Sequence, residues 1–253
     1  MVRVSIVLKM TKRLKFFLSH ISISILLALI IIAWVFLIWY PQPLAQAVGV
    51  THIFLMMVAI DVVLGPILGF VVYKAGKKTL KFDLAVIILI QITALGYGLY
   101  SIAQGRPAWL VYNVDRFELV RNNEIIDTKT PDVQVKFREP SWFKPKFAAI
   151  ELAKNNEERS KNIFEEVVGG ISLAQRPERY VALAQAKSQI QKRAQNLIEL
   201  EKYNSKQQLK LVLEEYPSAD AWVPLKANAI DMVVLINRSS AQVIKIVNLR
   251  PWK

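Results

Sequence analysis

The chain has 253 residues, 53% of them hydrophobic, and a formal net charge of +13. It contains no cysteine, and both histidines lie in or beside apolar runs, so no usual zinc or haem site can be assembled. The sequence has no phosphate loop, dinucleotide-binding glycine pattern or nucleophile elbow, so we expect no cofactor and no catalytic or metal residues. Much of the excess positive charge flanks the apolar runs, which argues against a nucleic-acid partner.

Three apolar runs, residues 16–40, 53–73 and 84–104, each reach the roughly 20 residues needed to cross a bilayer. They predict a membrane protein with three transmembrane α-helices over about residues 16–40, 50–73 and 82–104, followed by a C-terminal α+β soluble domain. We therefore divide the chain into a basic N-terminus (1–15), a three-helix transmembrane region (16–104) and the α+β domain (105–253).

The distribution of basic residues predicts the orientation of these helices. Five basic residues precede the first run, four lie between residues 74 and 81, and the loop 41–47 carries no charge. Because cytoplasmic loops are enriched in Lys and Arg, we expect a cytoplasmic N-terminus and a C-terminal domain on the outer side of the membrane, which in a Gram-negative cell is the periplasm.

Two features near the N-terminus concern processing. Met1 and Met10 are both possible starts, and the compact basic lead after Met10 favours the hypothesis that translation can begin there. Ala45-Gln46-Ala47 resembles a signal-peptidase site, but the preceding apolar run is about twice as long as a usual signal core, so we expect no cleavage.

The second run carries one charge, Asp61, followed by Gly65 and Gly69. At about 100° per residue these three positions share one helix face, and Pro66 between the glycines is expected to kink the helix. A carboxylate at this depth is costly, so the face is expected to meet another helix rather than lipid. It is either a packing face with a protonated Asp or a face for a partner's membrane helix.

The third run supplies candidate partners for this carboxyl group. Gln91 and Thr93 lie at nearly the same expected depth as Asp61, so either is a candidate hydrogen-bond partner, as is a backbone carbonyl freed by the kink at Pro66. His20 and His52 lie at the ends of their runs and are expected to be interfacial. The full predicted packing or partner face is Asp61, Gly65, Pro66, Gly69, Gln91 and Thr93.

Beyond the third run, residues 105–107 (Gly-Arg-Pro) break the helix, and residues 109–120 resemble a strand. Asp115 and Arg116 lie within it, where an ion pair or a sheet-edge role is favoured over catalysis. We predict a turn at 121–124, a short strand at 133–137 and mostly loop over 130–146. Helices are predicted over 148–168, from Pro177 to about residue 203, and over 206–216. Strands follow at 221–226, 229–237 and 242–249, with a hairpin loop at 238–241.

Several short segments resemble one family, the type IV pilin accessory proteins of the TfpX/TfpZ group. They are the lead KRLKFF (12–17), Thr51-His52 followed by IDVVLGP (60–66), and Lys81-Phe82-Asp83. The resemblance covers nearly the whole chain from about Met10 and implies an inner-membrane protein that supports pilus assembly, with no established enzymatic activity. It also carries over six landmarks of the domain junction: Gly105, Arg106, Pro107, Asp115, Arg116 and Phe117.

Two functions remain open at this point. The first is a non-catalytic, chaperone-like accessory factor that stabilises or presents type IV pilin for assembly and surface display. Its partners would be a major or minor pilin, or the assembly platform, together with membrane lipid. The alternative is a periplasmic-facing membrane enzyme that modifies pilin or a lipid-linked precursor, and a large cavity with clustered acidic residues would favour it.

Overall fold

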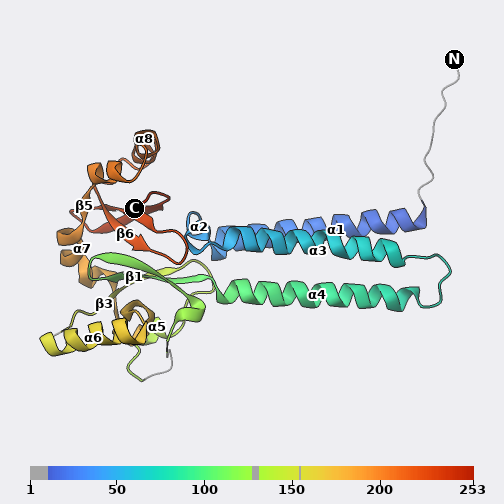
Figure 1. The fold of residues 1–253 in the computed structure, drawn as a ribbon, viewed down its shortest axis with the longest axis horizontal. Helices are drawn as coiled ribbons and strands as arrows, with labels where there is room; N and C mark the ends of the chain where they lie inside the picture. Colours follow the sequence, from blue (N-terminus) through green and yellow to red (C-terminus); the bar gives the residue numbers. More distant parts are fainter. Residues whose placement is uncertain (1–10, 127–130, 154) are drawn as a thin grey trace, which may run out of the picture. The chain divides into compact units, whose positions relative to one another are not determined.

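The computed structural model describes residues 11–126, 131–153 and 155–253. Contacts divide the chain into two compact units, one helical and one α+β (Figure 1). The helical unit comprises the chain up to Trp34 together with Thr51–Ile102, and the α+β unit comprises Val35–Val50 and Ala103–Lys253. The proposed start at Met10 lies outside the described residues.

Three long helices make up the helical unit: α1 (Lys12–Trp34), α3 (Val50–Val72) and α4 (Leu80–Gln104). They lie side by side in Figure 1, and each is long and apolar enough to cross a membrane. Most of their large apolar side chains are exposed, as expected of helices whose side chains face an apolar medium. The prediction of three long apolar helices followed by an α+β region is confirmed.

The segment between the first two long helices belongs to the α+β unit. It contains the π-helical turn η1 (Val35–Trp39) and the short helix α2 (Leu44–Val48). Ala47 is fully buried, and its carbonyl accepts a hydrogen bond from the N–H of Ala229 (2.9 Å). Gly49 ends α2 at φ 80°, where a Cβ would lie 2.9 Å from the Cβ of Ala229, so this close approach requires glycine.

A mixed sheet organises the α+β unit. Among the described residues it has eight strands in the order β4-β3-β1-β2-β6-β7-β8, with β5 paired to β6. The pairs β1–β3 and β2–β6 are parallel, and the other pairs are antiparallel. The strands are β1 (Pro107–Asn113), β2 (Arg116–Arg121), β3 (Lys146–Ile150), β4 (Tyr180–Val181), β5 (Gln195–Asn196), β6 (Ala221–Lys226), β7 (Met232–Asn237) and β8 (Gln242–Val247).

Large aromatic side chains fill the core around this sheet. Trp109 on β1 makes edge-to-face contacts with Phe137 and Tyr180, and Trp222 on β6 is fully buried. Short helices and helical turns surround the strands. They are η2 (Asn122–Glu124), α5 (Val135–Arg138), α6 (Asn156–Gly169), η3 (Leu173–Gln175), η4 (Pro177–Arg179), η5 (Leu183–Ala186), α7 (Lys187–Arg193), η6 (Leu197–Lys202) and α8 (Lys206–Glu215).

Predictions for the middle of this unit were wrong in three places. The predicted strand at 133–137 contains the helical turn α5, and the predicted helix 148–168 begins instead with strand β3, its helix α6 starting only at Asn156. The predicted long helix after Pro177 is a succession of short elements from η4 to η6. Ala148 and Ala149 favour a helix locally, but pairing of β3 with both β1 and β4 overrides that preference.

The C-terminal predictions were correct. Helix α8 and strands β6, β7 and β8 lie where the sequence placed them, and the turn of the β7–β8 hairpin falls within residues 238–241. Clear patterns of apolar strand residues bounded by turn residues explain this success.

Candidate functional site

The predicted face of α3 is largely occupied within the helical unit. Gly65, Pro66 and Gly69 are all buried. A Cβ at Gly65 would overlap the side-chain amide of Gln91 on α4, and a Cβ at Gly69 would lie 2.9 Å from the Phe16 ring of α1. The two glycines therefore let α4 and α1 approach α3, which is the packing interpretation of this face.

Asp61 meets α4 through its backbone rather than its carboxyl group. The Gln91 amide donates to the carbonyl oxygen of Asp61 (3.2 Å), while the hydroxyl of Thr93 donates to the Leu89 carbonyl of its own helix (2.8 Å). Carboxyl oxygen Oδ2 of Asp61 is buried and has no hydrogen-bond partner among the described residues. The structure thus brings Asp61 and Gln91 together, but through the backbone carbonyl of Asp61 and not through the expected hydrogen bond to its carboxyl group.

Of the two glycines on α4, Gly96 remains open. The side chain of Met57 on α3 fills the space over Gly98, whereas a Cβ at Gly96 would have no described atom within 4 Å. Leu89, Thr93 and Tyr100 are exposed and lie close to Gly96 in helical projection. This set of four, which we call the open face of α4, could admit another helix without displacing any described side chain.

The junction landmarks fall in two places. Gly105, Arg106 and Pro107 connect α4 to β1, and Arg106 is buried, with its guanidinium donating to the carbonyls of Ala103 (2.7 Å) and Ser141 (3.3 Å). Burial lowers the pKa of Arg106, and the neighbouring Tyr40 partly opposes that shift. Arginine nevertheless stays cationic at neutral pH.

Asp115, Arg116 and Phe117 lie at the other end of the β1–β2 hairpin. Asn113 pairs with Arg116 next to the turn, whereas Pro107 pairs with Arg121 at the junction end, so these landmarks are not brought together. Val114 has φ 57° and forms a tight turn in which the Asp115 N–H donates to the Asn113 carbonyl (2.7 Å). A β-branched residue gives no turn signal, which is why residues 109–120 were interpreted as one strand.

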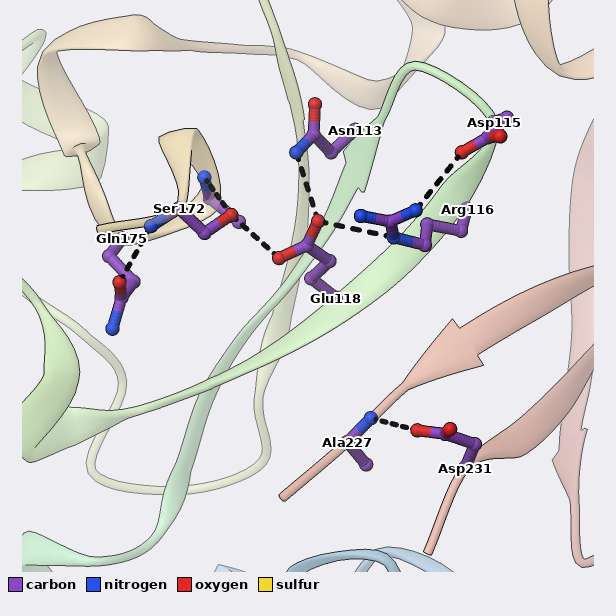
Figure 2. A network of polar contacts seen from close by, with 9 residues as sticks. Asn113, Asp115, Arg116, Glu118, Ser172, Gln175, Ala227 and Asp231 are labelled. Atoms are coloured by element: carbon purple, nitrogen blue, oxygen red, sulfur yellow. Dashed lines mark hydrogen bonds and ion pairs between the residues drawn. The ribbon is translucent and has the colours of Figure 1, made fainter. Parts of the chain in front are cut away.

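A buried carboxylate network holds this hairpin end (Figure 2). Glu118 is only 6% exposed, and its carboxylate accepts hydrogen bonds from Asn113 (2.9 Å) and from the hydroxyl of Ser172 (2.7 Å). Arg116 forms ion pairs with Glu118 (3.4 Å) and with Asp115 (3.7 Å). The Asp115–Arg116 pair agrees with the ion-pair interpretation, and the network fixes the hairpin against the segment before η3.

A cavity of about 940 Å³ opens beside this network and was not evident from the sequence. Its walls come from the hairpin turn, from the end of β3 through helix α6, from Leu173 and Val181, and from the η5–α7 region. Both apolar and charged side chains line it, including Ile150, Leu152, Ile163, Arg116, Arg159, Glu166, Ser188 and Arg193.

The chemistry available at the cavity is limited in the part of the chain that the structure describes. There, no group of three or more His, Cys, Asp or Glu residues could hold a metal ion. Both histidines lie in the long helices, so Ser188 has no histidine on the cavity wall to act as its base. A concave site with apolar walls and a few charged groups is suited to binding a ligand that carries both kinds of group.

Comparison with known proteins identifies relatives of the chain. The family model of the fimbrial assembly protein FimB matches residues 8–49. Fimbrial assembly proteins of Dichelobacter nodosus are similar over most of the chain: that of serogroup E1 is 32% identical over 192 residues, covering 75% of this chain and 74% of the relative, and that of serogroup I is 31% identical over the same shares. That of serogroups C1 and C2 is 30% identical over 114 residues, covering 44% of this chain and 87% of the relative.

No solved structure matches the chain. The match to the relatives extends well beyond residues 8–49, so it includes more than the first apolar helix. The chain therefore belongs to the FimB family of fimbrial assembly proteins, a type IV pilus assembly accessory family.

Proposed function

We propose that the protein holds type IV pilin in the bacterial inner membrane, without catalysis, and presents it for addition to the growing fibre. The observation that carries the proposal is the large cavity in the α+β unit of a chain whose relatives are named as fimbrial assembly proteins. A pilin has an apolar N-terminal helix and a globular head, and the chain offers a surface of matching chemistry for each.

The proposed orientation rests on charge. Lys74, Lys77, Lys78 and Lys81 flank the turn between α3 and α4, and Lys12, Arg13 and Lys15 begin α1. Because basic residues remain on the cytoplasmic side, these ends are assigned to the cytoplasm and the α+β unit to the periplasm. Reporter fusions active only in the periplasm should be active after Lys253 and inactive after Lys78.

The client's apolar helix is assigned to the open face of α4. The positions around Gly65 and Gly69 already hold side chains of the same chain, so a client there would have to displace them. Gly96 instead leaves room for close approach of a second helix. A photo-crosslinking residue at Thr93 should capture pilin in native membranes, whereas one at Leu29, 58% exposed on α1, should not.

The client's head is assigned to the cavity, which supplies specificity because charged and polar groups discriminate between similar partners better than an apolar helix surface can. The test is Ser188→Trp, which places a large ring on the cavity wall at an exposed position. It should lower the number of surface pili and weaken pilin pull-down, with pilin transcription unchanged.

Lys187→Trp is the matched control, because Lys187 is the exposed neighbour on the same helix and does not line the cavity. Equal fibre counts for Ser188→Trp and Lys187→Trp would contradict binding at the cavity.

Exchange of residues 105–253 between relatives should change which pilin is assembled into surface fibres. Exchange of the long helices should change this pilin preference less.

The enzyme alternative is favoured by one observation, the size of the cavity. Glu166 is the lining carboxylate to test, because Asp115, which also lines the cavity, already pairs with Arg116 (3.7 Å). If the protein were a carboxylate-dependent enzyme, Glu166→Gln would abolish pilus assembly while protein level and pilin binding stayed normal. A non-catalytic holder predicts at most a graded loss that follows the loss of pilin binding.

A further inference from the structure

The short loop between α5 and β3 carries two adjacent exposed aromatic side chains. Trp142 is 62% exposed and Phe143 is 61% exposed, whereas Trp109, Tyr180 and Trp222 of the same unit are buried in its core. Neither residue belongs to the cavity. Two neighbouring aromatic rings left in water cost hydrophobic free energy, so this loop calls for a covering medium or partner.

The loop is held firmly despite this exposure. The indole N–H of Trp39 donates to the backbone carbonyl of Trp142 (3.0 Å), and the guanidinium of Arg106 donates to the carbonyl of Ser141 (3.3 Å). The same guanidinium lies 4.5 Å from the centre of the Trp142 ring. The Phe143 N–H also donates to the Ser141 hydroxyl (3.1 Å), so the rings are presented from an ordered backbone.

The two residues that hold the loop, Trp39 and Arg106, each lie at or just beyond the end of a long apolar segment. Trp39 is the last residue of the apolar run Lys12–Trp39, and Arg106 follows the last residue of α4, Gln104, by two positions. If α1 leads out of the cytoplasm and α4 does so again, both ends emerge on the same side of the membrane. The loop is therefore expected to lie near the boundary between the hydrocarbon core and the headgroups of the membrane.

Cations surround the two rings in the sequence. Lys136, Arg138, Lys144 and Lys146 are all exposed within this segment, against the acidic Asp132 and Glu139. Aromatic rings with nearby Lys and Arg are the composition found where a protein meets lipid headgroups, the rings lying at the interface and the cations at the phosphates.

We propose that residues 141–144 form an interfacial anchor whose partner is the outer leaflet of the inner membrane. Trp142 and Phe143 enter the boundary between headgroups and acyl chains, and the neighbouring cations contact lipid phosphates. The anchor fixes the start of the α+β unit against the bilayer surface. This inference rests on the proposed membrane location of the three helices, but it does not depend on pilin binding.

The chain has no cysteine, so a single one can be introduced and labelled specifically. Phe143→Cys, carrying an environment-sensitive fluorophore, is measured in the full-length protein reconstituted into phosphatidylethanolamine–phosphatidylglycerol vesicles. We expect blue-shifted emission, strong quenching by lipids spin-labelled near the headgroup, and several-fold weaker quenching by aqueous iodide than at a water-exposed control site. That control is Ile198→Cys, because Ile198 is 71% exposed in the α+β unit.

A third variant separates failure of this inference from failure of the proposed membrane location. Ile90→Cys, at a 63% exposed position on α4, should be quenched by deeply spin-labelled lipids if the helices span the bilayer. Lipid quenching at residue 90 with iodide access at residue 143 equal to that at residue 198 would overturn the anchor alone. Protection of residue 143 from iodide without lipid quenching would also overturn it, since a protein surface would then cover the loop.

Discussion

In the helical unit the close contacts are made by small residues, whereas in the α+β unit they are made by the largest side chains. The amide of Gln91 packs against Gly65, and the thioether of Met57 packs against Gly98. On the sheet, by contrast, Trp109 and Trp222 are almost fully buried. The long helices leave most of their large apolar residues exposed, and the sheet buries most of its own.

If the long helices lie in the membrane, as proposed, this contrast follows from the different solvents of the two units. In an apolar medium there is no hydrophobic driving force to bury apolar side chains, so helices associate through close backbone approach and a few polar contacts. In water, burial of apolar area is the main driving force, so the sheet gathers aromatic residues around it. Substitutions should accordingly weaken the two units by different mechanisms and by different amounts.

The largest effect is expected in the sheet core. Trp222→Ala should destabilise the α+β unit by about 3–5 kcal/mol, because it removes a fully buried ring and its hydrogen bond to the Asn196 carbonyl (3.0 Å). Chemical unfolding of the detergent-solubilised protein, followed by near-ultraviolet circular dichroism, measures this loss. Ile198→Ala, at an exposed position, should change stability by less than about 0.5 kcal/mol. Loss of membrane integration by Trp222→Ala would show that the two units are not independent.

An intermediate effect is expected between the helices. Gly65→Leu must displace the Gln91 amide and break its bond to the Asp61 carbonyl, at a cost of about 1–3 kcal/mol. Unfolding in mixed micelles by titration with dodecyl sulfate, followed by helical circular dichroism, measures the cost. Gln91→Ala in the Gly65→Leu background should recover part of it by making room.

The matched control is Gly96→Leu, which meets open space and should leave helix stability unchanged while weakening crosslinking of pilin at Thr93. Equal destabilisation by Gly65→Leu and Gly96→Leu would contradict the assignment of Gly65 to a packed position and Gly96 to an open one.

The long helices could be predicted from the sequence because their signal is local. An apolar run of sufficient length specifies a helix whatever its neighbours are, and the glycine spacing pointed to close packing. The contact partners were harder to predict. The sequence placed Gln91 near Asp61, but only the structure shows that the amide fills the space over Gly65 and bonds to a backbone carbonyl.

In the α+β unit, prediction failed where distant segments decide the outcome. Strand β3 forms because β1 and β4 pair with it, and no pattern within residues 146–150 predicts a strand there. The segment 41–47 was interpreted as a loop, yet it includes the start of helix α2 and contributes Leu44 and Ala47 to the core. The cavity is built from several separate stretches of chain, so no local motif could have revealed it.

A smaller, pH-dependent effect is expected at Glu124 in the α+β unit. Burial opposes its ionisation, but hydrogen bonds from Arg121 (2.7 and 2.9 Å) and Asn228 (2.8 Å) outweigh burial and lower the pKa of Glu124 below its ordinary value of 4.5. Ionised Glu124 therefore stabilises the fold above about pH 4.5, and this contribution is lost as pH falls through the lowered pKa.

Glu124→Gln should accordingly be less stable than the parent protein at neutral pH, and the difference should shrink in acid. Thermal unfolding across the acidic range measures it. Glu214→Gln serves as the control, because Glu214 is 61% exposed and makes only a surface pair with Lys210 (3.7 Å). A difference for Glu124→Gln that grows in acid would contradict the assigned direction.

The smallest effect is expected at Asp61, the only acidic residue of α3. Its buried oxygen Oδ2 accepts no hydrogen bond from any described residue, and a lone ionised carboxylate within an apolar helix would be costly, so the group is expected to be protonated. Asp61→Asn keeps the shape and the neutral charge, and it leaves the backbone carbonyl that binds Gln91 untouched. Protein level, helix stability and surface pilus count should therefore stay at parental values. Loss of pili by Asp61→Asn at normal protein level and topology would mean that the charge, or exchange of its proton, is required, and a purely packing role for this face would then be untenable.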